Sequence, residues 1–259
     1  MNRGMDVRKL LGVWTLGAVA VCSYADADAD TDTPYKLRIE SGQFWINRND
    51  ARIPGDSGTL FGLNDLTGRG AKTTNTRFDL TYKQNKDTEW RLLYAPFSSS
   101  GTGNLDAPVT FRGTVFSAGP TFAYYQFNSY RLTYRRTWKD TESSKWMFGY
   151  TLKVRDAEIR LEQGGKVEAE KDPRGIVPLL HLSGFERVSD KMFFDFDIDG
   201  LFAPQGRAID LGARLNYQIN DRGDSFFVGG RVLEGGADNP KVYSFAAVYY
   251  FSIGYTVKF

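Results

Sequence analysis

Two short stretches of this 259-residue sequence carry side chains that could do chemistry. In the first, His181 is followed two residues later by Ser183, and Glu186 comes soon after. His181 is the only histidine, so any reaction that uses an imidazole as general base must use it. Residues two apart on a strand share a face, whereas Glu186 falls on the opposite face unless a bulge intervenes. The three residues are therefore candidate catalytic groups, with His181 and Ser183 as the pair.

The second stretch places Asp195, Asp197 and Asp199 at alternate positions. Three carboxylates along one strand face repel each other unless cations or protons compensate them. We expect a structural network with facing Arg and Lys side chains, and the alternatives are a cation-selective constriction or a Ca²⁺ site. Calcium needs about six to eight oxygens around one point, which a straight strand does not supply alone. No metal site is therefore predicted.

The C-terminal stretch, residues 241–259, indicates which kind of element positions these groups. Counted back from the end, every second residue is apolar or aromatic: Phe259, Val257, Tyr255, Ile253, Phe251, Tyr249, Ala247 and Phe245. Strict alternation is the period of a β-strand. About 10 tilted residues suffice to cross the hydrocarbon layer of a membrane, so this stretch is long enough to span it.

Nine further segments carry strand signals, and no apolar run outside the first 25 residues is long enough for a spanning helix. The expected strands cover residues 35–47, 77–84, 89–97, 122–138, 146–155, 176–188, 192–202, 207–219, 226–233 and 241–259. We expect segments 98–104 and 109–116 to extend one hairpin beyond the membrane, and residues 162–175 to form a charged loop. Long and short connections alternate. The pattern predicts an all-β fold, a single closed antiparallel transmembrane barrel of about 10 strands, with 8–12 still open.

The ionic faces of these strands are expected to line the lumen, because an Arg or Lys facing lipid near the midplane costs roughly 2–4 kcal/mol. The predicted lumenal charge network consists of Arg131, Arg135, Lys153, Arg155, Asp195, Asp197, Asp199, Asp210 and Arg214, with Arg77, Asp79, Lys83, His181 and Lys258 on the same faces. Ten strands predict a narrow bore. The alternative is a water-soluble fold, in which the apolar faces would pack together as one core.

The first 34 residues have a different composition. Residues 1–25 combine a basic start, an apolar core and a small-residue site ending at Ala25, which predicts a cleaved secretory signal peptide. Residues 26–34 form an acidic leader, and residues 35–259 form the barrel. Cleavage removes the only cysteine and leaves equal numbers of basic and acidic residues. We therefore expect no disulfide or Cys-based metal site, no nucleic-acid partner and no cofactor.

One expected external loop is unusually apolar. Residues 58–68 contain Leu60, Phe61, Leu63 and Leu66. Exposed clusters of large apolar side chains are uncommon on soluble surfaces. We expect these four residues to pack over the barrel rim, to plug the mouth, or to dock a partner or hydrophobic substrate.

The whole mature chain resembles Gram-negative outer-membrane β-barrels, in which a terminal Phe preceded by alternating apolar residues is recognised by the barrel assembly machinery. The resemblance implies that Phe251, Ile253, Tyr255, Val257 and Phe259 form the assembly signal. It also implies an outer-membrane location, lipid and lipopolysaccharide as surroundings, and export by the signal peptide. The strand number also matches the omptin proteases, whose catalysis uses acidic pairs and an Asp-His dyad. No Asp-x-His pattern occurs here.

The His181 and Ser183 spacing resembles the outer-membrane lipid A deacylases, which use Ser, His and Glu; here Gly184, Phe185 and Glu186 follow instead of that family's small, Asn-rich continuation. The leading functional hypothesis is a non-enzymatic integral outer-membrane protein, structural or acting through its external loops. The alternatives are a small-solute or ion pore and a lipid A-modifying acyl hydrolase. The sequence does not fix the oligomeric state.

Overall fold

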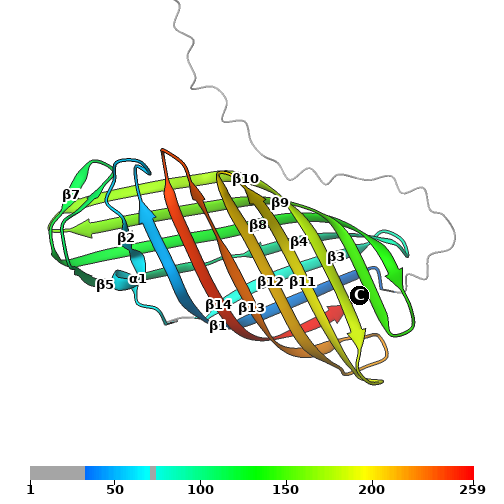
Figure 1. The fold of residues 1–259 in the computed structure, drawn as a ribbon. Helices are drawn as coiled ribbons and strands as arrows, with labels where there is room; N and C mark the ends of the chain where they lie inside the picture. Colours follow the sequence, from blue (N-terminus) through cyan, green and yellow to red (C-terminus); the bar gives the residue numbers. More distant parts are fainter. Residues whose placement is uncertain (1–32, 71–73) are drawn as a thin grey trace, which may run out of the picture. The chain divides into compact units, whose positions relative to one another are not determined.

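A computed structural model describes residues 33–70 and 74–259. The predicted signal peptide and most of the acidic leader lie outside the described residues. The barrel follows as one compact unit, in which ten antiparallel strands close on themselves (Figure 1). They are β1 (Tyr35–Arg52), β3 (Asn75–Lys83), β4 (Thr88–Ala95), β8 (Gly119–Asp140), β9 (Ser144–Gln163), β10 (Lys166–Arg187), β11 (Met192–Ala203), β12 (Gly206–Gln218), β13 (Ser225–Asp238) and β14 (Tyr243–Lys258). The prediction of a closed ten-stranded barrel is confirmed.

Closure is made by the first and last strands. β1 pairs with β14 along almost its whole length, from Lys36 opposite Lys258 to Arg52 opposite Tyr243. The register shifts once, between Ile46 and Arg48. The irregularity lies in the second half of the strand.

The two ends of the barrel differ. Short turns join β3 to β4, β8 to β9, β10 to β11 and β12 to β13, and both Tyr35 and Phe259 lie at this end, which we call the turn end. The opposite end, which we call the loop end, carries the β1–β3 and β4–β8 connections. Short turns and termini mark the periplasmic side in known bacterial barrels.

The prediction of a charged loop at residues 162–175 is wrong. β9 and β10 continue outward as a paired hairpin whose turn is only Gly164 and Gly165, both with positive φ. β8, β9 and β10 contain 22, 20 and 22 residues, against 12 and 13 in β11 and β12. One side of the wall therefore runs past the other at the loop end (Figure 1).

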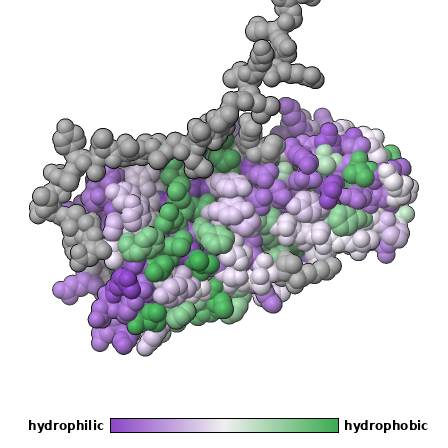
Figure 2. All heavy atoms as spheres, turned by 180° about the vertical axis from the view of Figure 1, so that it is seen from behind, coloured by the Kyte–Doolittle hydropathy of each residue, from purple (hydrophilic) through white to green (hydrophobic). Residues whose placement is uncertain are grey.

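The outer surface carries the apolar faces of the strands. Leu92, Leu132, Tyr150, Phe251 and Ile253 are all exposed, and each alternates with an inward polar residue. Figure 2 shows hydrophobic side chains gathered over the turn-end part of the wall and mostly hydrophilic ones at the loop end. Apolar-out, polar-in alternation of this kind is typical of barrels that face lipid. In the described ranges no helix is both long and apolar enough to cross a membrane.

Five short elements fill and cover the loop end: β2 (Phe61–Gly62), α1 (Leu63–Thr67), β5 (Ser98–Leu105), β6 (Val109–Phe111) and β7 (Thr114–Phe116). β5 continues the track of β4 along β8, while β6 and β7 form a separate hairpin. This hairpin is held to the outer part of β10 by Thr114, which donates to Glu168 at 2.6 Å, and by an ion pair of 3.1 Å between Arg112 and Glu170. We call these five elements with the outer parts of β8, β9 and β10 the loop-end cap.

An apolar core lies beneath the cap. Phe61, Leu63 and Leu66 are buried, whereas Leu60 is 54% exposed. The three buried residues join inward side chains of the barrel wall in one cluster, including Phe44, Phe97, Tyr125, Leu161 and Tyr250. We call the segment from β2 through α1 the plug. Leu60 differs from the other three residues, because the chain enters the mouth only from Phe61 onward.

Candidate functional site

The aspartates of β11 point into the lumen, and arginines from several strands surround them. Asp195 binds Arg38 of β1 at 2.8 Å and the Nε of Arg214 of β12 at 2.7 Å. Asp197 is bound by Arg214 and also by Arg231 of β13, at 3.1 Å. Arginine donates through a planar fork, so one guanidinium can bridge two carboxylates. The triplet is therefore neutralised by guanidinium groups within the lumen.

Asp210 of β12 forms the centre of a second group. It binds Arg131 of β8 at 2.6 Å, Arg231 at 2.5 Å and Arg77 of β3 at 3.3 Å. Arg131 also reaches Asp199, at 2.7 Å. Because β8 and β11 are not neighbouring strands, these ion pairs cross the lumen and close it by side-chain contact.

Several members of the network were missing from the sequence-based set. They are Arg38 and Glu40 on β1, Glu89 and Arg91 on β4, and Arg231 on β13. The signal was present, because Arg91 alternates with the outward residues Trp90 and Leu92.

Two predicted members lie apart from the central pairs. Lys153 is buried, and its Nζ lies 4.5 Å from the centre of the Phe127 ring, a cation–π distance. Arg155, farther along β9, is only partly buried. Both residues mark the transition from the ionic lumen to the apolar core beneath the cap.

His181 and Ser183 face the lumen on β10. His181 Nδ1 lies 2.8 Å from Asp199 Oδ1, and its Nε2 lies 3.1 Å from Ser183 Oγ. Arg135 of β8, a predicted network member, places its Nη1 3.1 Å from the same Oγ. Glu186 points to the other face, where it accepts a hydrogen bond of 2.8 Å from Trp146. Glu186 therefore lies on the opposite face from His181, as the alternation predicts, because the strand contains no bulge between them.

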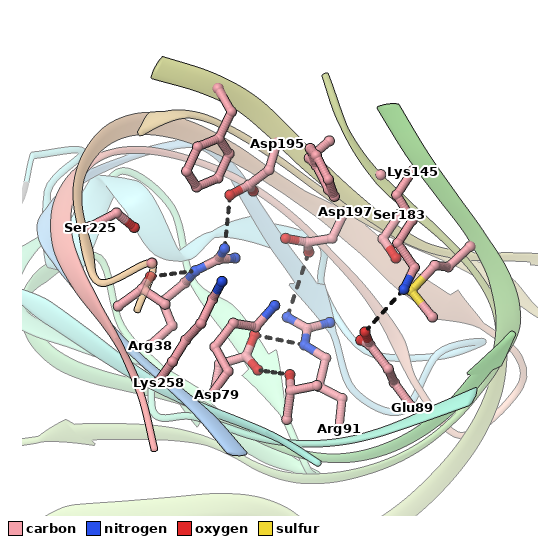
Figure 3. A pocket seen from close by; sticks show the side chains of 18 of the residues that line it. Arg38, Asp79, Glu89, Arg91, Lys145, Ser183, Asp195, Asp197, Ser225 and Lys258 are labelled. Atoms are coloured by element: carbon pink, nitrogen blue, oxygen red, sulfur yellow. Dashed lines mark hydrogen bonds and ion pairs between the residues drawn. The ribbon is translucent and has the colours of Figure 1, made fainter. Parts of the chain in front are cut away.

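A cavity of about 340 Å³ opens from this level toward the turn end. Ser183, Met147 and Phe185 line one part of it, and Lys36 and Lys258 line another. In the described part of the chain its wall carries nine basic and four acidic side chains. Figure 3 shows Ser183 and Lys145 on one side of this cavity, and Arg38 and Lys258 on the opposite side.

In the described residues no group of three or more His, Cys, Asp or Glu side chains is arranged to hold a metal ion. The aspartates of β11 instead use their oxygens to accept from arginine. The site is an ion-pair network, with one Ser–His–Asp row at the level of Asp197 and Asp199.

β14, the last strand, pairs with β1 and thereby closes the barrel. Phe251, Ile253 and Phe259 are exposed on the outer face, and Tyr255 and Val257 are partly exposed on the same face. The backbone groups of Tyr35 and Phe259 exchange two hydrogen bonds of 2.9 Å, and their rings stack with centroids 5.7 Å apart. The predicted assembly signal therefore forms one outward-facing ridge along β14.

No family model matches the chain, and no curated protein matches it. Among solved structures it is similar to the outer membrane protease OmpT of Escherichia coli, at 11% identity and a TM-score of 0.51, with 88% of this chain and 97% of that chain covered. Neisserial surface protein A, at 12% identity, covers 88% and 98% with a TM-score of 0.33. Ail, the attachment invasion locus protein of Yersinia pestis, at 11% identity, covers 86% and 98% with a TM-score of 0.34. The fold is that of the small outer-membrane β-barrels of Gram-negative bacteria, with no particular subfamily indicated.

Proposed function

We propose that the chain is an integral outer-membrane barrel whose lumen does not conduct. It acts at the cell surface through its loop-end cap, without catalysing a reaction there. The supporting observation is that the lumen is blocked twice. Arg131 joins Asp199 and Asp210 across the middle, and the plug places Leu63 and Leu66 in an apolar core above them. An open pore would need a continuous hydrated path, which neither layer provides.

The cap supports a structural or interaction role because its segments are fixed to one another. The backbone N–H of Arg112 donates to Ile53 at 2.8 Å, and the N–H of Thr59 donates to Thr110 at 2.9 Å, which ties the two long connections together. A surface held in this way has less conformational entropy to lose on binding than a mobile loop. The proposed surroundings are outer-membrane lipid along the apolar wall and lipopolysaccharide at the loop end, and the ridge on β14 is proposed to be recognised by the assembly machinery.

The lipid A hydrolase alternative is not favoured. His181 is fully buried in the lumen, and Ser183 lies close to the turn between β10 and β11. A lipid in the outer leaflet would have to reach both residues through the barrel wall. The small-solute pore is disfavoured by the two closed layers.

Conductance in planar bilayers tests the proposal. We expect no discrete current steps from the folded protein, with an open porin in the same bilayers showing that insertion is detected. A variant that replaces residues 60–67 by a Gly/Ser linker should also remain silent, because the ion-pair layer is intact. Steady steps whose ion selectivity changes in Asp197→Asn would contradict the closed lumen and support the pore.

A further inference from the structure

Ser183, His181 and Asp199 form a continuous hydrogen-bonded row across β10 and β11. His181 and Asp199 are directly opposed in the strand pair, and Ser183 follows two residues later on the same face. The row runs from Asp199 Oδ1 to His181 Nδ1 at 2.8 Å, and from His181 Nε2 to Ser183 Oγ at 3.1 Å. These are the connections by which a carboxylate orients an imidazole that takes a proton from a serine.

The surroundings of Asp199 fix the orientation of the imidazole. Its Oδ1 also accepts from Thr151 Oγ1 at 2.8 Å, and its Oδ2 accepts from Arg131 Nη1 at 2.7 Å. A carboxylate paired with arginine is an acceptor only, so the hydrogen of His181 lies on Nδ1. The lone pair of Nε2 is then directed at Ser183 Oγ, which is the arrangement that a general base requires.

A guanidinium group stands beside the serine oxygen. Arg135 Nη1 lies 3.1 Å from Ser183 Oγ and 3.4 Å from His181 Nε2. Its Nε and Nη2 are both held by Glu89, at 3.0 Å and 2.7 Å. The hydroxyl can donate to Nε2 while accepting from Arg135. A fixed cation at this place stabilises negative charge that develops on an oxygen next to Oγ.

Only the serine end of the row reaches open space. His181 and Asp199 are at most 1% exposed, whereas Ser183 is 6% exposed and lines the cavity toward the turn end. Met147 and Phe185 form an apolar wall next to it, and Lys36 and Lys145 also line the cavity. The cavity volume of about 340 Å³ suits a compact molecule rather than a lipid. Its excess of basic side chains favours one with negative charge.

We propose that Ser183 and His181 are the nucleophile and general base of a hydrolytic site, with Asp199 as the positioning residue, for small anionic carboxylic esters that enter from the turn end. Ser183 Oγ attacks the ester carbonyl carbon and its proton passes to His181 Nε2. The carbonyl oxygen becomes negative beside Arg135. Collapse breaks the carbon–oxygen ester bond, and the leaving alkoxide takes the proton from Nε2. Water then attacks the acyl-serine, again through His181, and releases the acid.

This proposal goes beyond the closed barrel and its cap, and it does not depend on either. Labelling with a small fluorophosphonate, which phosphonylates activated serines, tests the nucleophile in folded, detergent-solubilised protein. We expect one label, located on Ser183 by peptide mass spectrometry, and none on Ser183→Ala. The control Ser252→Ala removes another buried lumenal serine, whose partner is Glu40 at 3.0 Å, and should label normally. Electrophoresis without boiling verifies that each variant is folded.

The variant His181→Gln keeps the serine and removes the base, and we expect labelling at least about 100-fold slower. Unlabelled folded wild type, or equal labelling of Ser183→Ala, would overturn the proposal. Hydrolysis of p-nitrophenyl hydrogen succinate and p-nitrophenyl acetate tests the substrate class. The anionic ester should have the higher kcat/KM, and Lys36→Met should reduce that preference. A preference for the neutral ester that Lys36→Met leaves unchanged would overturn the assignment of an anionic substrate while leaving the labelling result intact.

Discussion

Arg131 joins two buried carboxylates of strands on the other side of the lumen. It binds Asp199 at 2.7 Å and Asp210 at 2.6 Å, and all three side chains are buried. Asp210 would keep Arg77 and Arg231 if Arg131 were lost. Within residues 33–70 and 74–259, Asp199 would keep the hydrogen bonds from Thr151 and His181. The cost of removing Arg131 should therefore come mainly from the unpaired charge of Asp199.

We predict that Arg131→Met destabilises the folded barrel by about 3–5 kcal/mol, the usual cost of breaking a buried ion pair. Urea unfolding in lipid vesicles, followed by tryptophan fluorescence, measures the change. Arg136→Met is a matched control on the same strand, because Arg136 is exposed. Arg131→Met/Asp199→Asn should recover part of the loss. Equal stability of the Arg131→Met and Arg136→Met proteins would show that the network contributes little.

Asp224, in the turn between β12 and β13, has a smaller role that depends on pH. Its carboxylate accepts the backbone N–H of Lys258 and the side-chain amide of Asn220, each at 2.8 Å. These bonds, chiefly the one from Lys258, hold the pKa of Asp224 below its usual value. A lowered pKa in the folded state stabilises the fold above the unfolded-state pKa of about 3.9, and this contribution is lost as the pH falls through the folded-state pKa.

We therefore expect wild type to be more stable than Asp224→Asn at neutral pH, and the difference to shrink as the pH falls below about 4. Unfolding midpoints of the two proteins between pH 7 and pH 2 give the comparison. Asp221→Asn, in the same turn, is the control, because Asp221 is exposed. A difference that stays constant down to pH 2 would mean that the Asp224 carboxylate does not act through its charge.

At the scale of single residues, the sequence predicted the face of most charged side chains but not their partners. Asp195, Asp197 and Arg214 follow the alternation of long apolar strands, so their inward orientation was predictable. That Arg131 reaches Asp210 across the lumen was not, because β8 and β12 are neither adjacent nor joined directly. Such contacts depend on barrel closure, which no local pattern contains.

At the scale of elements, the hairpin of β9 and β10 shows where alternation fails as a signal. Beyond the apolar wall, β9 still alternates, with buried Ile159 and Leu161 between charged residues. The outer part of β10 has charged residues on both faces, with Glu168 and Glu170 on one face and Lys171 on the other. The period of 2 is therefore lost in the first part of β10, and this is why residues 162–175 were predicted to form a charged loop. The remaining cue was Gly164-Gly165, a pair typical of two-residue hairpin turns.

The plug depends on a close approach between α1 and β5. A Cβ at Gly103 would collide with the carbonyl oxygen of Asp65 and come within 2.7 Å of the Cα of Leu66. The helix has five residues and no side-chain cap, so packing must hold it in place. Small side chains on β5 let Leu66 enter the apolar core.

We expect Gly103→Leu to displace α1 and to destabilise the barrel by about 1–3 kcal/mol, the usual cost of overpacking. New proteolytic cleavage within residues 60–68 would report the displacement. Gly200→Ala is the control, because a Cβ there meets its nearest atom at 3.8 Å. If Gly103→Leu is as protease-resistant as wild type, the plug is not held by this contact.

At the scale of the whole molecule, the lumen consists of two layers with different chemistry. Toward the turn end, arginines and carboxylates neutralise one another, and toward the loop end the plug and the wall form an apolar core. The ionic layer cannot be exchanged with the outer apolar faces, because several charges in lipid would exceed the stability of a typical fold. The same inside-out arrangement explains why a sequence with a mean hydropathy of −0.40 can present an apolar wall.

If this wall lies in a bilayer, the destabilisation caused by an outward-facing arginine should depend on its depth in the membrane. Leu132 and Trp138 both face outward on β8, at 41% and 69% exposure, but Trp138 lies six residues nearer the turn end. If lipid surrounds the barrel, Leu132→Arg should cost roughly 2–4 kcal/mol and Trp138→Arg about 0–1 kcal/mol from lipid contact. Urea titration of refolding into vesicles measures both. In a water-soluble barrel neither arginine would meet lipid, so both variants would fold with nearly unchanged stability and greater solubility, and the membrane assignment would be wrong.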